Sequence, residues 1–218
     1  MTPTDGSWRV DGRTVHWRFG WSVSPGRPAA RSLARQWTEQ LVREHELFAW
    51  TGIESAPSGV KPRFAGDVDA DFSVSYSGAA VVVAVASGDG VGVDVEAAPF
   101  RALRSDALLR RMCSEREARR ARAMEPQERA GHLAQLWTAK EAAVKASGRG
   151  LSHDFRTFEF DLPPHSHNLS AVAHLALTGE RGVALSRVEI FDDLVRTFTA
   201  PSASYPGVAP HLTPEESR

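Results

Sequence analysis

The feature that most constrains this chain is a pair of motifs within residues 90–151. The first, Gly-Val-Gly-Val-Asp-Val-Glu at residues 90–96, places valine at every second position, which is the period of a half-buried β-strand. Asp94 and Glu96 therefore leave the same face of the strand, with their Cα atoms about 6.6 Å apart. Two carboxylates at this spacing can converge on one hard cation such as Mg²⁺.

The second motif, Trp-Thr-Ala-Lys-Glu-Ala-Ala-Val-Lys at residues 137–145, is predicted to be helical. Its apolar positions recur at helical spacing, and a glycine marks the expected end: Leu133, Leu136, Trp137, Val144 and Gly148. Trp137, Glu141 and Lys145 are four residues apart and share a face, with Lys140 beside it. If this helix packs on the strand, Glu141 joins the other two carboxylates. Carboxylates, Mg²⁺ and lysines together favour phosphate-ester or pyrophosphate transfer.

Together the two motifs resemble those of the 4′-phosphopantetheinyl transferases. The shared residues are Gly-Val-Asp-Val-Glu and, about forty residues later, Trp-Thr-x-Lys-Glu-Ala-x-x-Lys-Ala-x-Gly-x-Gly-Leu. They are more similar to the monomeric, surfactin-synthetase-activating type than to the short trimeric holo-acyl-carrier-protein synthases. The resemblance implies an α+β fold of two similar halves, residues 1–89 and 90–200, related by a pseudo-twofold axis with the ligand between them. Residues 201–218, rich in Pro, Ser and Glu, are expected to form a disordered tail.

The activity that this resemblance implies is that of a holo-[acyl-carrier-protein] synthase. Such an enzyme transfers the 4′-phosphopantetheine moiety of coenzyme A to a serine of an acyl or peptidyl carrier protein, and it releases adenosine 3′,5′-bisphosphate. Carriers of secondary-metabolite synthases are favoured over a fatty-acid carrier alone. Two alternatives remain open: a non-catalytic homologue that binds carrier protein or coenzyme A, and another Mg²⁺-dependent pyrophosphate-cleaving enzyme on the same scaffold.

By the same resemblance, three carboxylates would hold Mg²⁺ on the pyrophosphate: Asp94, Glu96 and Glu141. Lys140 and Lys145 would neutralise the charge that develops there as the bond breaks. The serine proton would pass to Glu141 or to Glu117, directly or through metal-bound water, and the sequence does not choose between them.

The nucleotide end of coenzyme A is assigned to the N-terminal half by resemblance alone. Residues 72–77 are similar to the family segment Phe-Asn-x-Ser-His-Ser, with Ser73 in place of asparagine and Tyr76 in place of histidine. The residues expected to bind coenzyme A are Ser75, Tyr76, Arg31 and Ser32 of an Arg-Ser-Leu helix, Lys61 of Gly-Val-Lys-Pro, and Lys140.

The segment between the two motifs is dense in arginine. Its arginines are Arg101, Arg104, Arg110, Arg111, Arg116, Arg119, Arg120 and Arg122. Such runs are usually solvated helix faces, although the resemblance offers a dock for acidic carrier domains instead. Ser114 and Glu117 have the spacing of a helix capping box. The family also places a carboxylate at the position of Glu117 near the diphosphate, and the two interpretations are compatible.

Composition limits the other classes of function. A net charge of −1, with no base-stacking motif beside the arginines, argues against a nucleic-acid partner. The chain has no apolar run of membrane-spanning length and no signal region, so a cytoplasmic protein without a membrane partner is expected. The single cysteine, Cys113, rules out an internal disulfide. Only three of the 26 basic residues are lysine, which indicates that these three positions require a compact ammonium and not a planar guanidinium group.

Hydrophobic patterning and turn residues predict the remaining elements. We expect a hairpin around residues 11–12, a helix over 29–50, and strands over 72–78, 79–86, 155–162, 169–177, 183–191 and 194–199.

Overall fold

A computed structural model of the 218-residue chain describes residues 2–24, 26–57, 60–100, 103, 105–148, 154–162, 164, 166–179, 182–191 and 195–199. The main elements are β1 (Thr4–Val10), β2 (Arg13–Trp21), α1 (Arg27–Glu44), β3 (Ala70–Ser77), β4 (Ala80–Ser87), β5 (Val91–Ala97), α2 (Asp106–Met112), α3 (Glu115–Arg122), α4 (Pro126–Ser147), the 3₁₀ helix η3 (Phe155–Thr157), β6 (Ala171–Gly179), β7 (Gly182–Ile190) and β8 (Val195–Thr199). The predicted tail at residues 201–218 lies outside the described residues.

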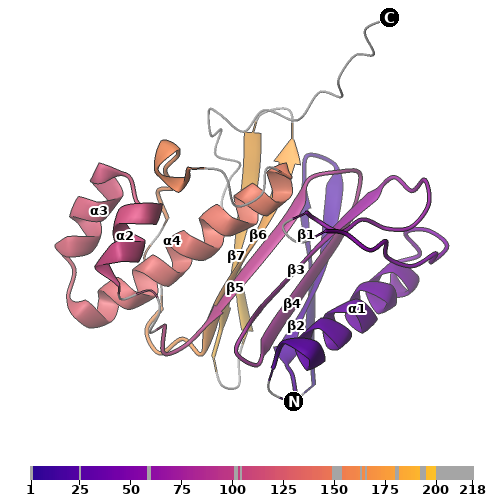
Figure 1. Ribbon diagram of the computed structural model, residues 1–218, viewed down its shortest axis with the longest axis horizontal. Coiled ribbons are helices and arrows are strands. Elements are labelled where there is room, and N and C mark those ends of the chain that lie inside the picture. The colour runs from indigo at the N-terminus through magenta and orange to yellow at the C-terminus, as the bar shows by residue number, and fades with distance from the viewer. Residues whose placement is uncertain are drawn as a thin grey trace, which may run out of the picture.

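The strands form two four-stranded antiparallel sheets, in the orders β1-β2-β4-β3 and β5-β6-β7-β8 (Figure 1). The first sheet comes from the N-terminal part of the chain and the second from the C-terminal part. Together with four α-helices in the described residues, this mixed architecture is compatible with the predicted α+β class.

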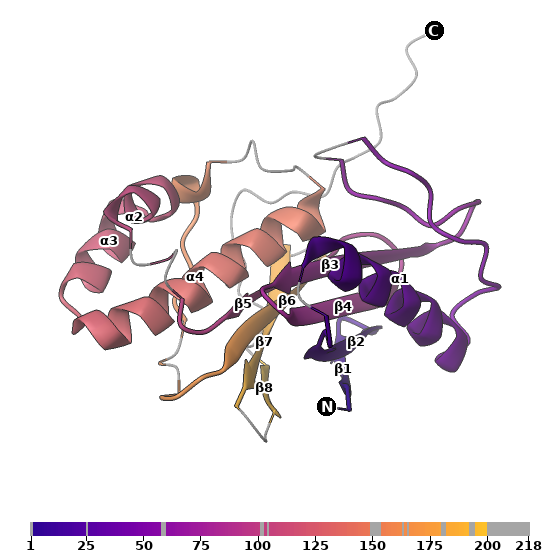
Figure 2. The same cartoon turned by 60° about the horizontal axis from the view of Figure 1, so that its bottom comes forward.

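Three hydrophobic clusters hold the layers together. One lies between the two sheets and contains side chains from both, among them Trp17, Phe19, Val93 and Leu175. A second joins α1 to the first sheet, and a third joins α2, α3 and α4 to the second sheet. Figure 2 shows α1 and α4 on the same side of the molecule, each over its own sheet.

Most of the predicted elements are confirmed. The hairpin turns at Asp11 and Gly12, both of which have positive φ. The strands expected over 72–78, 79–86, 169–177, 183–191 and 194–199 correspond to β3, β4, β6, β7 and β8. The helix of the second motif is α4, and Gly148 ends it in the left-handed conformation that the sequence predicted.

The helix predicted over 29–50 is shorter than expected. α1 ends at Glu44, where the amide of His45 still donates to the carbonyl of Leu41, and Glu46 then adopts a positive φ. Leu47 and Phe48 pack against the same core as α1, but from the connection that follows it. Their apolar spacing therefore reflects this shared core and not a continued helix.

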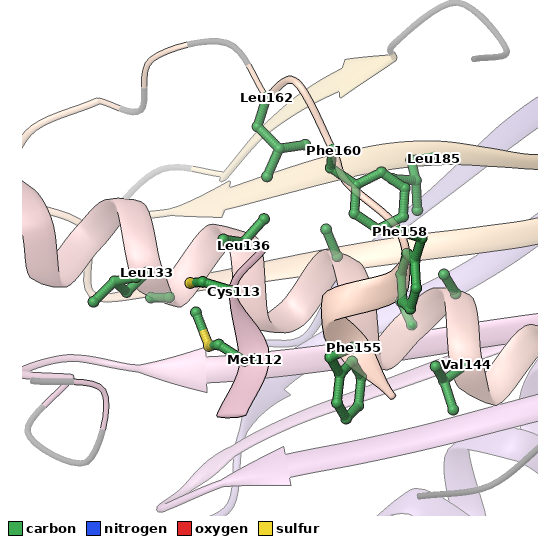
Figure 3. Close-up of a cluster of buried hydrophobic side chains, with 14 of the residues drawn as sticks. Met112, Cys113, Leu133, Leu136, Val144, Phe155, Phe158, Phe160, Leu162 and Leu185 are labelled. Carbon is green, nitrogen blue, oxygen red and sulfur yellow. The ribbon is translucent and has the colours of Figure 1, made fainter. Parts of the chain in front are cut away.

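The strand predicted over 155–162 is wrong. The segment begins as η3 and continues without strand structure, although Phe158, Phe160 and Leu162 are buried at alternating positions. Figure 3 shows these side chains among those of Met112, Leu133 and Leu136. The alternation therefore reflects burial against α2 and α4. The backbone carbonyls of Phe155 and Phe158 accept hydrogen bonds from the Lys140 ammonium, so they do not take part in a strand ladder.

Candidate active site at the seam between the sheets

The two sheets meet along β3 and β5, which run side by side in the same direction (Figure 1); we call this junction the seam. In the described residues, β3 and β5 share no backbone ladder, and the isolated parallel bridge of Ala70 is with Gly88, in the turn between β4 and β5. Side chains of β3 replace the missing ladder. The Asp71 carboxylate accepts from the Val91 amide (2.7 Å), and the Ser73 hydroxyl accepts from the Val93 amide (3.0 Å).

Helix α4 approaches β5 closely because residue 92 is glycine. A Cβ atom at Gly92 would lie 1.9 Å from the carbonyl oxygen of Ala142 and 2.5 Å from the amide nitrogen of Ala146. No side chain fits in this space. The close approach brings Glu141 and Lys145 of α4 over the face of β5 that carries Asp94 and Glu96.

Asp94 is oriented by donors from both sides of the seam. Its Oδ1 atom accepts from the Ser75 hydroxyl and from the Lys145 ammonium, each at 2.7 Å. Its Oδ2 atom is buried and has no hydrogen-bond partner, and the same holds for Oε1 of Glu141. Two buried carboxylate oxygens are therefore left without donors in one cluster, and such groups are uncommon in folded proteins.

Glu96 is the outer carboxylate of the cluster. Its Oε2 atom accepts from the Ser77 hydroxyl at 2.7 Å. Burial raises the pKa of Glu96, and the charge of Asp94 adds to this shift, whereas the Ser77 hydroxyl, the charge of Lys145 and the Trp137 indole lower it.

Glu141 shows the larger electrostatic effect. Burial raises its pKa to about 7, and the neighbouring charges of Asp94 and Glu96 act in the same direction. Lys145 and Arg111 oppose the shift. Three carboxylates that repel one another in a partly dry site favour either a proton or a cation between them.

The described residues contain no group of three His, Cys, Asp or Glu side chains already arranged to hold a metal ion. The cluster nevertheless fits a hard divalent cation, since such ions take carboxylate oxygens and two of these oxygens are buried without partners. Asp94, Glu96 and Glu141 are the residues that would hold it.

Lys140 and Glu117 lie apart from this cluster, in the core between α4, α3 and η3. The Lys140 ammonium is fully buried and donates to Glu117 (2.6 Å) and to the carbonyls of Met112, Phe155 and Phe158. The predicted capping box is confirmed, because Glu117 accepts from the Ser114 amide while the Ser114 hydroxyl accepts from the Glu117 amide. In this arrangement Lys140 has no exposed surface with which to contact a ligand.

The residues expected to bind the nucleotide end of coenzyme A do not lie together in one place. Ser75 is buried at the seam on Asp94, and Lys61 binds Asp71 and the carbonyl of Val91. Tyr76 leaves the opposite face of β3 and packs against the α1 core. Arg31 and Ser32 are exposed on α1.

Ser77 is a site residue that the motifs alone do not reveal. Its signal in the sequence is the alternation of serine with apolar residues over 72–77, which predicts one hydroxyl-bearing face. Trp137 shares a helix face with Glu141, so its proximity to the carboxylates follows from that spacing.

Exposed arginines gather on α2 and α3, which lie beside the N-terminal part of α4 (Figure 1). Three of them bind acidic groups: Arg116 to Glu159, Arg119 to Glu115 and Arg120 to Asp161. Arg101 and Arg104 lie outside the described residues. Cys113 is buried between these helices, and burial raises its pKa to about 11, so it is a poor nucleophile.

The fold and the site define an α+β protein with a carboxylate and lysine cluster at the junction of two sheets, suited to a cation and a phosphorylated ligand. Residues 90–191 match the model of the 4′-phosphopantetheinyl transferase superfamily. This match covers β5 to β7 with α2 to α4, somewhat less than half of the chain, and supports the superfamily. No protein of curated function matches the sequence. Among the described residues, no helix has the length and apolar character needed to cross a membrane.

Proposed function

We propose that this protein transfers the 4′-phosphopantetheine moiety of coenzyme A to a serine of an acyl or peptidyl carrier protein, as a monomeric enzyme of the surfactin-synthetase-activating type. The observation that carries the proposal is the pair of unpartnered, buried carboxylate oxygens of Asp94 and Glu141, next to Glu96 and Lys145. Their place at the seam supports a ligand bound between the two halves, residues 1–89 and 90–200.

In this proposal Asp94, Glu96 and Glu141 hold a divalent cation, Mg²⁺, which supplies Lewis-acid stabilisation of charge on the pyrophosphate when bound. Lys145 lies against this cluster and is about one-third exposed, so its ammonium can turn from Asp94 to an incoming phosphate. Its positive charge favours the leaving adenosine bisphosphate.

The proton of the carrier serine requires a nearby acceptor. The Glu117 carboxylate is engaged by Lys140 and by the amides of Ser114 and Phe160, so it is poorly placed for this role. Glu141 lies in the cluster and keeps a buried carboxylate oxygen without a hydrogen-bond partner, which can take the proton directly or through metal-bound water. We therefore assign the proton to Glu141.

Mass spectrometry of carrier proteins tests the proposal. Apo-carriers from a secondary-metabolite synthase and from fatty-acid synthesis are incubated with coenzyme A, Mg²⁺ and the protein, and a mass increase of one phosphopantetheine group is expected. Asp94→Asn serves as the inactive control. Cleavage of coenzyme A without a change in carrier mass indicates a different pyrophosphate-cleaving enzyme. Binding of either partner without any reaction indicates a non-catalytic homologue.

A further inference from the structure

The carboxylates of the candidate metal site receive hydrogen bonds from residues that have no assigned role in it. Ser75 and Ser77 of β3 donate to Asp94 and Glu96, respectively, each at 2.7 Å. Lys145 of α4, which already has a proposed role, donates to Asp94 from the other side at 2.7 Å. The donors thus come from β3 of the first sheet and from α4, which covers the second sheet, and they meet on the two acidic residues of β5.

Each donor contacts one oxygen in a way that leaves another available. On Asp94, Ser75 and Lys145 both bind Oδ1, so Oδ2 is left buried without a partner. On Glu96, Ser77 binds Oε2. A carboxylate held by one oxygen has a fixed plane, and its second oxygen then points in a defined direction.

We propose that Ser77, with Ser75, positions Asp94 and Glu96 for a divalent cation, so that the N-terminal sheet completes a metal site whose ligands all lie in the C-terminal half. The inference rests on the proposed function, because it takes these carboxylates as the cation's ligands. It assigns the serine face of β3 to the carboxylates of the site, whereas family resemblance alone assigns the segment to the nucleotide of coenzyme A.

The seam offers a matched control within the same strand. Ser73 lies on the same face of β3 as Ser77, but its hydroxyl accepts from the Val93 backbone amide and contacts no carboxylate. Ser73→Ala therefore removes a hydrogen bond across the seam without removing a donor to the site. Ser77→Ala removes a donor to Glu96, and Ser77→Thr restores the hydroxyl.

The direct measurement is Mn²⁺ binding to the full chain, followed by the electron paramagnetic resonance signal of free Mn²⁺, with and without coenzyme A. We expect Ser77→Ala to raise the dissociation constant about tenfold, the usual effect of removing a hydrogen-bond partner of a metal ligand. Ser77→Thr should recover most of the affinity. Ser73→Ala should lower the unfolding midpoint and leave Mn²⁺ binding unchanged.

The outcomes separate this inference from the proposed function. If the wild type binds Mn²⁺, Asp94→Asn does not and Ser77→Ala binds as the wild type does, the cation site stands and the positioning role is refuted. Equal losses in Ser77→Ala and Ser73→Ala would mean that the hydroxyls only hold the sheets together, which also refutes it. If the wild type binds no Mn²⁺ in either condition, the cation site itself fails and the inference fails with it.

Discussion

The Lys140 ammonium lies 2.6 Å from the Glu117 carboxylate in the core beside α4, and the side chains of both residues are almost entirely inaccessible to solvent. Burial lowers the pKa of Lys140, and the hydrogen bond and charge of Glu117 oppose that shift. The pair ties α3 and the segment after α4 to the helix that carries Glu141. Lys140 thus holds α4, the helix that carries Glu141, in place against its neighbours, and it does not contact the carboxylate cluster itself.

Replacing Lys140 by alanine should therefore destabilise the protein. Removal of one partner from a buried ion pair leaves the other charge without compensation, which costs about 3–5 kcal/mol. Urea unfolding of Lys140→Ala measures this loss. The control is Arg43→Ala, since Arg43 pairs with Glu39 on the exposed face of α1 and its removal should change the free energy of unfolding by about 1 kcal/mol or less. Equal stability of the two variants would contradict the structural role of Lys140.

Lys145→Arg should be poorly tolerated although it keeps the charge. The ammonium donates at once to the Val93 carbonyl (3.0 Å) and to Asp94 (2.7 Å), in directions that a planar guanidinium fork does not match. We expect carrier modification to fall at least about tenfold, or about 1.4 kcal/mol in activation free energy. Mass spectrometry gives the rate, and an unchanged circular dichroism spectrum confirms folding. Wild-type activity would show that a compact ammonium is not required here.

Gly92→Ala should disturb the contact between α4 and β5. The new Cβ would meet the helix backbone, so the helix must shift, and overpacking of this kind costs about 1–3 kcal/mol. The shift moves Glu141 and Lys145 away from Asp94, and Mn²⁺ affinity should fall with stability. Gly179→Ala is the control, because a Cβ there has its nearest neighbour at 3.5 Å. Similar effects of both variants would contradict a special role for Gly92.

His174 should make the protein sensitive to acid. The imidazole is buried beneath α4, its Nδ1 lies 2.7 Å from the Thr138 hydroxyl, and burial lowers its pKa from 6.5 to about 3. The unfolded chain therefore binds a proton below pH 6.5 that the folded chain excludes, so this contribution to stability is complete above pH 6.5 and is lost as the pH falls towards 3.

Between pH 6.5 and about pH 4.5 the contribution of His174 should fall by on the order of 2–3 kcal/mol. Protonation of Glu141, whose pKa is raised to about 7, stabilises the folded state over the same range, so the His174 contribution is measured as the difference in thermal unfolding between the wild type and His174→Gln. His174→Gln should flatten the acid limb of the stability profile, whereas His16→Gln should change it less, because His16 is only partly buried. An unchanged acid limb in His174→Gln would show that His174 does not titrate as described.

The strands and the carboxylate face were predictable from the sequence because both depend on local period. Alternating valines placed Asp94 and Glu96 together, and the four-residue spacing placed Glu141 and Lys145 on one face of α4. The same reasoning does not tell whether the side chain of Lys140 faces the site or the core. Successive residues on a helix diverge by about 100°, so the neighbour of a site residue can face the core.

The remaining errors arose where tertiary contacts replaced regular structure. Residues 158–162 alternate like a strand, but the buried ammonium of Lys140 takes backbone carbonyls from this segment. Lys61 and Lys145 likewise donate to carbonyls of β5, those of Val91 and Val93. All three lysines of the chain therefore pair a carboxylate with backbone carbonyls, and only the fold reveals those partners.

The seam has a consequence for local opening of the protein. Along β5, the amides of Val91 and Val93 donate to the side chains of Asp71 and Ser73, whereas the other edge of the strand pairs with β6. The two sheets can therefore separate at this edge without breaking the backbone ladder of either. Deuterium uptake at these two amides would report such breathing, separately from exchange that requires global unfolding. A ligand that spans both sheets should slow it.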